Sequence, residues 1–354
     1  MSAKRFLRFF AVFTLFSSLI VGMLSAAAAY WWLHRPNLNL EPLVVDIQQG
    51  DTLNGLAERW QSQGWVESAL ALKVAAKIVG AGRDIRAGEF IVPAQLNSFE
   101  LLSFLASAQA RTYRLTLIEG RPLSEAVEVL QHADHLKQDL GELSVGRISE
   151  FLALEQHHEA QLYPDTYVYH RNEPVSSVIR QAHDRLNTVL AEEWKQRAQG
   201  LPYKTPYEAL VMASIIEKET GVASERPVIA GVFVRRLQKN MRLETDPTVI
   251  YGLGDSFSGN LTRAHLRDRS NPYNTYRNKG LPPGPIALAG RAAINAALHP
   301  APGTELYFVA KGDGSHYFSS TLSEHNEAVR RYQLSRREDY RSAPAPAENT
   351  ESSK

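Results

Sequence analysis

The chain has 354 residues, with 39 Lys plus Arg against 38 Asp plus Glu, 44% hydrophobic residues and no cysteine. This length suggests two or three structural units with enough apolar residues for real cores. The absence of cysteine excludes disulfide scaffolds, cysteine-ligated zinc or iron–sulfur sites and thiol catalysis. A formal net charge of +1 argues against a dedicated nucleic-acid-binding protein, which would carry a basic surface.

The amino-terminal residues predict a membrane anchor. Residues 9–33 carry no formal charge and follow the basic residues Lys4, Arg5 and Arg8. A helix that crosses the hydrocarbon core of about 30 Å needs roughly 20 apolar residues, so this run is long enough to span a membrane. Basic flanks stay on the cytoplasmic side. We therefore expect residues 1–8 in the cytoplasm, a single transmembrane anchor over residues 9–33, and the rest of the chain outside the cytoplasm.

A cleavable signal peptide is the alternative interpretation of this segment. Residues 25–29 offer the small side chains that precede a signal-peptide cleavage site. The apolar run is longer than a usual signal core, and residues 30–32 resemble an interfacial aromatic belt, so the sequence favours an anchor. In a bacterium with an outer membrane, the anchor would lie in the inner membrane and the remaining chain in the periplasm. The periplasm has no ATP, which argues against nucleotide-driven functions.

The segment after the anchor predicts a small module of strands and helices. Residues 34–42 contain two prolines and are expected to form a linker. The residue pattern then predicts a strand (43–47), two helices (53–60 and 68–79), a strand (88–91) and a third helix (98–108). With Gly50, Asp51 and Thr52 at the turn before the first helix, this order resembles the LysM module, which often binds the amino-sugar backbone of peptidoglycan or chitin. We assign residues 43–118 to this LysM-like module; a module that merely packs against its neighbour is the alternative.

The next part of the chain mixes strands with helices. The pattern predicts strands at 113–118 and 167–169, and helices at 123–140, 148–154 and 175–197. Residues 119–204 are therefore expected to form a helical and mixed connecting part. At the other end, residues 336–354 contain alternating Ala and Pro followed by polar residues, and they are expected to be disordered. The whole pattern predicts an α+β protein.

A well-specified helix follows at residues 206–219. Thr205 to Glu208 spell a capping box with proline at the first helical position. Gly221 is expected to end the helix, with Thr220 as its C-cap.

This helix carries two carboxylates, Glu217 and Glu219. They point to nearly opposite faces, because successive helical residues are about 100° apart. On a helical wheel Glu217 lies on a mixed face, whereas Glu219 shares the arc of Met212, Ile215 and Ile216 that should meet the interior. Burial and the negative end of the helix dipole would both raise the pKa of Glu219, as a general acid near neutral pH requires. The alternative is that Glu219 is a solvated residue at a helix end.

Polar and aromatic loops follow this helix. A second helix is expected from Ser224, as its N-cap, to Leu237. It is followed by a polar loop (243–248), an Asn- and Tyr-rich turn (271–276) and a loop of Gly and Pro (279–285). Amides, hydroxyls and aromatic faces on stiff loops suit sugar rings, which need hydrogen bonds and stacking surfaces. Well-capped turns without a ligand are the alternative.

Several motifs in this region carry a family resemblance. They are ASIIEKET (213–220), ASER (223–226), RLETDPTVIYG (242–252), YNTY (273–276) and GLPPGPI (280–286), with shorter matches at 163–167, 299–300, 307–310 and 325–326. With them, residues 43–332 resemble the YceG-like family of endolytic murein transglycosylases, membrane-anchored lytic enzymes of the bacterial cell wall. The resemblance implies that residues 205–335 form a mixed α+β catalytic region, with Glu219 at a helix end similar to that of lysozyme-like lytic transglycosylases.

The resemblance also implies a mechanism with one carboxyl group. Protonated Glu219 would donate to the glycosidic oxygen between N-acetylmuramic acid and N-acetylglucosamine, and then take the proton of the muramyl C6 hydroxyl as a 1,6-anhydro ring closes. A hydrolase would need a second carboxylate, for which Glu225, Glu244 and Asp246 are candidates. Thr220 is expected to orient Glu219. The full set of supporting or substrate-binding candidates is Glu217, Thr220, Ser224, Glu225, Glu244, Thr245, Asp246, Tyr251, Asn274 and Tyr276.

We expect no metal and no cofactor. The 11 histidines show no HExxH spacing, the neighbours His157 and His158 are poorly placed to share a metal ion, and the chain has no GxSxG motif for a serine nucleophile. The expected partners are peptidoglycan glycan strands, the membrane and, from the resemblance, penicillin-binding proteins. A competing hypothesis is a membrane-anchored scaffold that binds peptidoglycan through the LysM-like module and recruits synthases.

Overall fold

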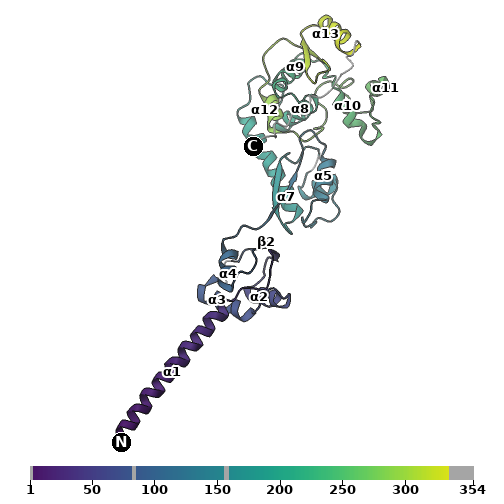
Figure 1. The fold of residues 1–354 in the computed structure, drawn as a ribbon. Helices are drawn as coiled ribbons and strands as arrows, with labels where there is room; N and C mark the ends of the chain where they lie inside the picture. Colours follow the sequence, from purple (N-terminus) through teal and green to yellow (C-terminus); the bar gives the residue numbers. More distant parts are fainter. Residues whose placement is uncertain (1–2, 82–84, 155–158, 335–354) are drawn as a thin grey trace. The chain divides into compact units, whose positions relative to one another are not determined.

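The computed structural model describes residues 3–81, 85–154 and 159–334, which form two compact units (Figure 1). Unit 1 contains the chain up to Tyr113 together with residues 170–172, and unit 2 contains residues 114–169 and those from Glu173 onward. The expected disordered tail, 336–354, lies outside the described residues. The two units are treated separately below.

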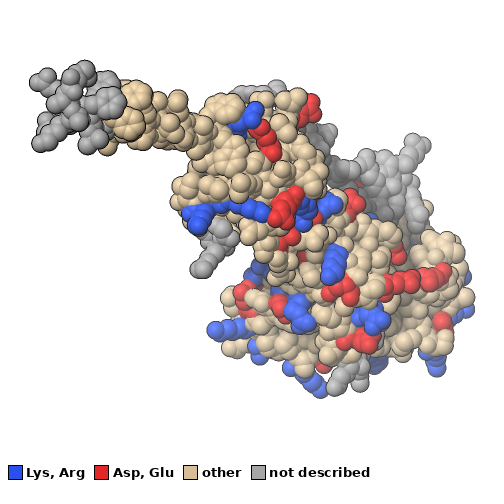
Figure 2. Space-filling view, turned by 90° about the horizontal axis from the view of Figure 1, so that it is seen from below, with Lys and Arg blue, Asp and Glu red and all other residues tan. Residues whose placement is uncertain are grey.

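The first element, α1 (Ala3–Leu33), is a continuous apolar helix. Its segment Val12–Leu33 is long and apolar enough to cross a membrane. Side chains such as Phe13, Leu15 and Leu24 are exposed, and Figure 2 shows the described part of this rod without acidic or basic side chains. Elsewhere on the face in Figure 2, charges of both signs are interspersed. The helix is consistent with a single-pass membrane protein.

Residues 34–42, the predicted linker, are hydrogen-bonded to the rest of unit 1. Pro36 forms an isolated antiparallel bridge with Asn97, the N–H of Asn37 donates to the carbonyl of Leu96 (3.0 Å), and the N–H of Leu38 donates to that of Trp65 (2.8 Å). The segment is held because its extended backbone finds hydrogen-bond partners along unit 1.

The rest of unit 1 has the predicted order of strand, two helices, strand and helix. Its elements are β1 (Leu43–Ile47), α2 (Leu53–Ser62), α3 (Ala69–Val79), β2 (Gly88–Val92) and α4 (Ser98–Ser107). β1 and β2 are antiparallel, with Leu43 opposite Val92. Thr52 caps α2 by accepting from the N–H of Gly55 (3.2 Å), and the side chains of Trp60 and Phe90 lie in the core. The assignment to LysM itself remains a prediction.

A buried carboxylate organises the end of unit 1. Glu89 on β2 is 1% exposed and accepts hydrogen bonds from Arg111 (3.1 Å), Arg171 (2.7 Å) and the hydroxyl of Tyr113 (2.8 Å). Three donors compensate the cost of burying this charge. These bonds tie residues 170–172 to unit 1.

Beyond α4 the chain forms two further two-stranded sheets and most of the helices. The strands are β3 (Thr112–Thr116) paired with β4 (Thr166–His170), and β5 (Tyr307–Ala310) paired antiparallel with β6 (His316–Ser319). The helices are α5 (Leu123–Gln131), α6 (Val145–Phe151), α7 (Val175–Lys195), α8 (Pro206–Glu219), α9 (Arg226–Gln238), α10 (Asp246–Leu253), α11 (Arg263–Arg267), α12 (Arg291–Leu298) and α13 (Leu322–Val329), with short turns η2 (Ala223–Glu225), η3 (Gly254–Ser256) and η4 (Arg330–Leu334).

The predicted helix at 123–140 is wrong in its second half. α5 ends at Gln131, and residues 132–144 form a loop before α6. The side chain of Gln131 accepts from the N–H of Leu143 (2.7 Å), and the backbone of Lys137 pairs with the chain just before α7. These longer-range bonds satisfy the backbone in place of the helical ones.

The core of unit 2 surrounds α8. This helix packs against α7, α9, α10 and α12, and Figure 1 shows it between the last three. Every residue from Ala209 to Ile216 is buried. A helix that is buried on all sides has no solvent-facing stripe. On the helical wheel, the mixed face of Glu217 also holds Leu210 and Ser214. Both are buried, as Met212 on the predicted interior face is, so the distinction between the two faces is wrong for this helix.

Candidate active site

The bounds of α8 agree with the prediction at both ends, but its caps differ in detail. Thr205 accepts from the N–H of Glu208 (3.2 Å) and Pro206 opens the helix. The carboxylate of Glu208 accepts from the N–H of Lys204 rather than from that of Thr205. At the other end the chain leaves through an extended Thr220 with φ −147° and ψ 136°, and Gly221 is not among the residues with positive φ, so it does not act as a left-handed stop.

Glu217 belongs to a structural ion pair. Its side chain is 4% exposed, one carboxylate oxygen accepts from Arg226 (3.0 Å), and the other accepts from the N–H of Gly290 (3.0 Å). The neighbouring Lys218 points away and donates to the carbonyl of Gly120 (3.1 Å). The carboxylate of Glu217 is thus fully engaged within unit 2.

Glu219 is a carboxyl group without a cationic partner among the described residues. It is partly buried at the last position of α8, where the hydroxyl of Thr245 donates a hydrogen bond to its Oε1. Burial raises the pKa of Glu219 to about 7; the hydrogen bond from Thr245 works against this rise, and the charge of Asp246 adds to it. At neutral pH this carboxyl group is therefore poised to release or accept a proton.

Hydrogen bonds hold the loop that contains Thr245. The N–H of Thr245 donates to the hydroxyl of Thr275 (3.0 Å), which also contacts the hydroxyl of Thr248 (2.9 Å). The preceding residue, Glu244, has φ +54°, a left-handed conformation that is uncommon for a residue with a side chain. The polar loop predicted at 243–248 is in part the start of α10, with Thr245 as N-cap and Pro247 in the first turn.

Glu219 opens into a cavity of about 530 Å³. The cavity lies between the end of α8, the loop before α10, the β5–β6 hairpin and α13, all in unit 2. Its lining residues include Glu219, Arg236, Leu243, Glu244, Thr245, Asp246, Tyr276, Tyr307, Phe308, His316, His325 and Asn326. Carboxylates, hydroxyls, imidazoles and aromatic rings on a concave surface match the chemistry of a carbohydrate site.

The other carboxylates of the cavity are paired. Glu244 receives a hydrogen bond from Arg236 (3.2 Å), and Asp246 receives one from the hydroxyl of Tyr276 (2.7 Å). Burial, together with the neighbouring Asp246, raises the pKa of Tyr276, so this hydroxyl stays protonated and donates.

The imidazole of His325 stacks on Tyr307 with ring centres 5.2 Å apart. Burial, and then the charge of Arg236, lower its pKa, while Glu244 opposes the shift. A neutral imidazole therefore lies in the cavity with Glu219.

Glu225 does not face the cavity as a lone carboxylate. Its two oxygens accept from the N–H (2.8 Å) and from Nδ1 (2.8 Å) of His316, and from the hydroxyl of Thr220 (3.2 Å). The expectation that Thr220 orients Glu219 is not met, because the hydroxyl of Thr220 contacts Glu225 and the hydroxyl of Thr245 contacts Glu219.

Three other candidates lie elsewhere. Ser224 is exposed inside η2 and does not cap α9, which corrects its interpretation as a helix N-cap. Tyr251 donates to Glu159 (3.2 Å) and packs on Tyr273. Asn274 is fully buried and holds the backbone of its own loop. None of these three is among the lining residues of the cavity.

The structure adds residues that the candidate set lacked. Arg236, Tyr307, His316, His325 and Asn326 all line the cavity. Tyr307, His325 and Asn326 fall within motifs of the family resemblance, so a signal existed for them. Arg236 and His316 carried none in the sequence, since they reach the cavity through the packing of α9 and the β5–β6 hairpin.

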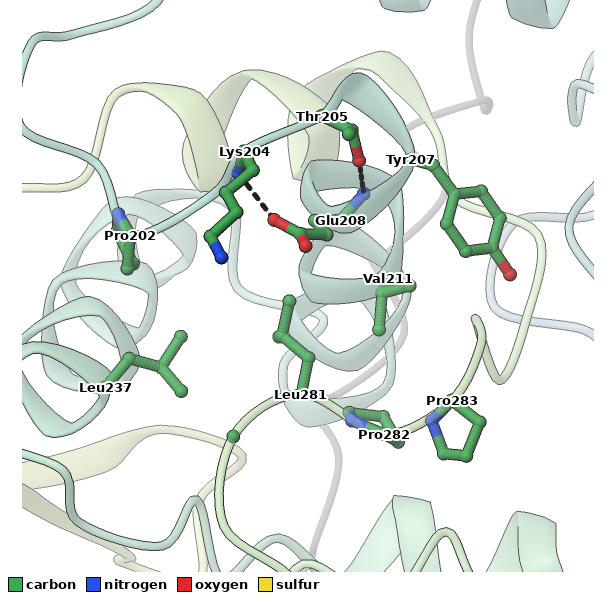
Figure 3. Close-up of a pocket in the computed structure, with 11 residues that line it drawn as sticks. Pro202, Lys204, Thr205, Tyr207, Glu208, Val211, Leu237, Leu281, Pro282 and Pro283 are labelled. Carbon is green, nitrogen blue, oxygen red and sulfur yellow. Dashed lines mark hydrogen bonds between the residues drawn. The ribbon is translucent and has the colours of Figure 1, made fainter.

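A second cavity of about 540 Å³ lies at the opposite end of α8 (Figure 3). Its lining residues include Leu281 and Pro282. The carboxylate among the described lining residues belongs to Glu208. Figure 3 shows that the carboxylate of Glu208 accepts from the backbone N–H of Lys204, while the backbone N–H of Glu208 donates to the hydroxyl of Thr205, so Glu208 is part of the helix cap. The cavity at Glu219 is therefore the better candidate for chemistry. Within the described ranges, no group of three or more His, Asp and Glu side chains is arranged to hold a metal ion.

Comparison with known proteins points to one family. Residues 45–331 match the YceG-like family. The endolytic murein transglycosylase of Bacillus subtilis (strain 168) is 30% identical over 319 residues, which is 83% of this chain and 86% of the relative.

Two further comparisons agree with this. The endolytic murein transglycosylase of Streptococcus pneumoniae serotype 2 (strain D39) is 30% identical over 176 residues, but this match covers 48% of the chain and 31% of the relative. A crystal structure of a yceG-like protein from Listeria monocytogenes aligns with a TM-score of 0.51 and 26% identity, covering 81% of this chain and 98% of that one.

Proposed function

Because the chain belongs to the YceG-like family and is a lytic transglycosylase acting on peptidoglycan, we propose that it cuts glycan strands internally with Glu219 as its catalytic carboxyl group. The bond cleaved is the β-1,4 linkage from N-acetylmuramic acid to N-acetylglucosamine. The new strand ends carry a 1,6-anhydro ring. Cleavage of this kind would limit the elongation of nascent glycan.

The chemistry needs one group in two protonation states. Protonated Glu219 donates to the glycosidic oxygen while positive charge develops at the muramyl anomeric carbon. The resulting carboxylate then takes the proton of the muramyl C6 hydroxyl, whose oxygen attacks the anomeric carbon and closes the ring. The proton returns to Glu219 and no water is consumed, so the step is that of a lyase.

The observation that carries this proposal is the state of Glu219. Its pKa of about 7, caused by burial, suits a group that must be acid and base in turn. The carboxylates considered as second catalytic groups are engaged elsewhere: Glu225 with His316, Glu244 with Arg236 and Asp246 with Tyr276. This supports a single-carboxylate lyase over a two-carboxylate hydrolase.

The test is digestion of purified sacculi by the full-length protein in detergent. Mass spectrometry of the released fragments should show anhydro ends, lighter by one water than hydrolysed ends, and Glu219→Gln should abolish release. Reducing ends would contradict the lyase and indicate a hydrolase. No release by the unmodified protein would favour a peptidoglycan-binding scaffold.

Glu217→Gln is the matched control, two positions away in the same helix. It leaves Arg226 without its carboxylate in a buried setting, so the protein should lose stability by about 3 kcal/mol while its folded fraction still cleaves glycan. Urea unfolding and the sacculus assay measure the two effects. If Glu217→Gln is inactive while folded and Glu219→Gln is active, the assignment of Glu219 is wrong.

We further propose the topology of the chain. α1 anchors it in the inner membrane with the amino terminus in the cytoplasm and units 1 and 2 in the periplasm, where nascent glycan emerges. Penicillin-binding proteins, which polymerise that glycan, are the proposed protein partners.

A further inference from the structure

A carboxylate–imidazole pair lies beside the catalytic carboxyl group. Glu225 is the last residue of η2 and His316 is the first residue of β6, 91 positions later. The N–H and Nδ1 of His316 both approach the carboxylate of Glu225 at 2.8 Å. The side chain of Glu225 is 13% exposed and that of His316 is 9% exposed, so water competes little with this contact.

The contact with Glu225 fixes the tautomer and the orientation of the imidazole of His316. Since a carboxylate can only accept, Nδ1 of His316 must carry the hydrogen atom. In the neutral ring Nε2 then holds a lone pair on the opposite edge. Within the described residues, Nε2 has no hydrogen-bond partner, and His316 lines the cavity that contains Glu219. The ring of Phe308 packs edge to face against the imidazole, with ring centres 5.4 Å apart, and restricts its rotation.

The pair and Glu219 share one frame. Thr220, which directly follows Glu219, donates to Glu225 (3.2 Å) and accepts from the N–H of Val222 (3.0 Å). The end of α8 and the start of β6 are therefore connected through one partly buried carboxylate. A displacement of Glu225 would move the imidazole and the chain next to the catalytic group together.

We propose that Nε2 of His316 accepts a hydrogen bond from a hydroxyl group of the bound glycan, and that Glu225 is a positioning residue that fixes the orientation and tautomer of the ring. This inference rests on the proposed cleavage of glycan by Glu219. It assigns Glu225 a role other than that of a second catalytic carboxylate. A side chain needed only to hold Glu225 would require the Nδ1 donor alone, whereas His316 also presents an acceptor to the cavity.

Two substitutions of His316 separate the roles of its ring nitrogens. In His316→Asn the amide N–H can replace Nδ1, so the contact with Glu225 is kept and the cavity-facing acceptor is lost. In His316→Gln the longer amide can reach the place of Nε2, while the contact with Glu225 is lost. The full-length protein in detergent is assayed on sacculi for kcat and KM, and each variant is checked by thermal unfolding.

The proposal expects His316→Asn to unfold near the temperature of the unmodified protein and to lose roughly tenfold or more in kcat/KM, the size of one lost hydrogen bond in an active site. His316→Gln should unfold at a lower temperature but retain more activity per folded molecule than His316→Asn. If His316→Asn is fully active, or if His316→Gln is the less active of the two per folded molecule, the contact between Glu225 and His316 only stabilises the fold and the proposal is overturned.

A double substitution tests the part played by Glu225. Glu225→Gln alone should lower kcat/KM, because the ring is no longer fixed. Added to His316→Asn it should lower kcat/KM by much less than it does alone, since the imidazole that it positions is already absent. Additive losses would overturn the positioning role. An inactive unmodified protein would overturn the proposed function and this inference with it, whereas activity that depends on Glu219 but not on His316 overturns this inference alone.

Discussion

Glu217 and Glu219 are separated by one residue, yet their surroundings differ. Glu217 has an arginine and a backbone N–H at 3.0 Å, which stabilise its charge within the fold. Glu219 has a hydroxyl donor and a nearby carboxylate, so its charge is poorly compensated. The chemistry of α8 is therefore decided by what surrounds the last turn of the helix, since both residues are glutamates.

The hydroxyl of Thr245 should tune the pH dependence of cleavage. It donates to the ionised form of Glu219 and so lowers a pKa that burial raises. Thr245→Val removes the donor, so the pKa of Glu219 should rise and activity should persist to higher pH, because the acid form is needed for the first step. The measurement is kcat/KM from about pH 5 to about pH 9. Thr245→Ser, which keeps the hydroxyl, is the control; a shift of the basic limb toward lower pH in Thr245→Val would contradict the explanation.

Ionisation of Glu219 should also destabilise the folded protein at neutral and alkaline pH. Its pKa is about 7 in the folded chain against an ordinary 4.5, so between these values the folded state keeps a proton that the unfolded state loses. Stability therefore falls as pH rises through this window. Glu219→Gln removes the effect and should be more stable by about 1–3 kcal/mol at pH 8, with little difference at about pH 4. Urea unfolding at both values measures this; an equal gain at both would show that proton linkage is not the cause.

Among the elements, α10 is tightly packed at Gly252. A methyl group on Gly252 would come within 2.0 Å of Oδ1 of Asn271. Asn271 cannot move aside freely, because it is buried and bonds Val249 (3.2 Å) and Tyr273 (2.9 Å). The position requires glycine for close approach rather than for its backbone conformation.

Gly252→Ala should therefore destabilise the protein by about 1–3 kcal/mol through overpacking and reduce activity by moving the start of α10, which carries Asp246. Gly146→Ala is the matched control in α6, where the nearest atom, Oγ of Ser144, would be 3.8 Å from the added methyl group. That substitution should be neutral or stabilising by about 0.5–1 kcal/mol, since glycine is unfavourable inside a helix. Thermal unfolding compares the two. Equal unfolding temperatures would mean that the residues around Gly252 move aside to accept the added methyl group.

The elements also show where sequence patterns are sufficient. β1, α3 and α8 form where the periodicity and caps predict them, because their signals are local: alternation in β1, Ser68 and a left-handed Gly80 around α3, and Thr205 with Pro206 at α8. The end of α5 and the start of α10 were missed, because each depends on bonds or packing with residues distant in the chain. The hairpin of β5 and β6 and the helices α12 and α13 were not predicted either.

Taken over its full length, the chain joins an apolar helix to unit 1 without a free linker. Arg35 pairs with Glu67 (2.5 Å) and lies over Trp31, and His34 contacts Phe99 with ring centres 5.0 Å apart. These contacts of His34 and Arg35, the two residues after α1, hold the end of the helix against the rest of unit 1.

We predict that α1 is retained as an anchor. The chain recovered from the membrane fraction should keep its amino terminus and its full mass of 39.5 kDa, and should resist extraction by alkaline carbonate. Intact-mass spectrometry distinguishes this from cleavage after residues 25–29. A chain that begins near Tyr30 and is found in the soluble fraction would show that the segment is a signal peptide.

The sequence by itself determined the apolar span, the order of elements in unit 1 and the bounds of α8, because length, periodicity and caps are properties of neighbouring residues. Its motifs led to the proposal of Glu219. It did not determine which residues surround Glu219. Thr245 in place of Thr220, the engagement of Glu225 by His316, and the entry of Arg236 and His325 into the cavity were decided by tertiary structure. The physical reason is that burial and hydrogen bonds between residues tens of positions apart set the charge of a carboxyl group, and no local pattern encodes them.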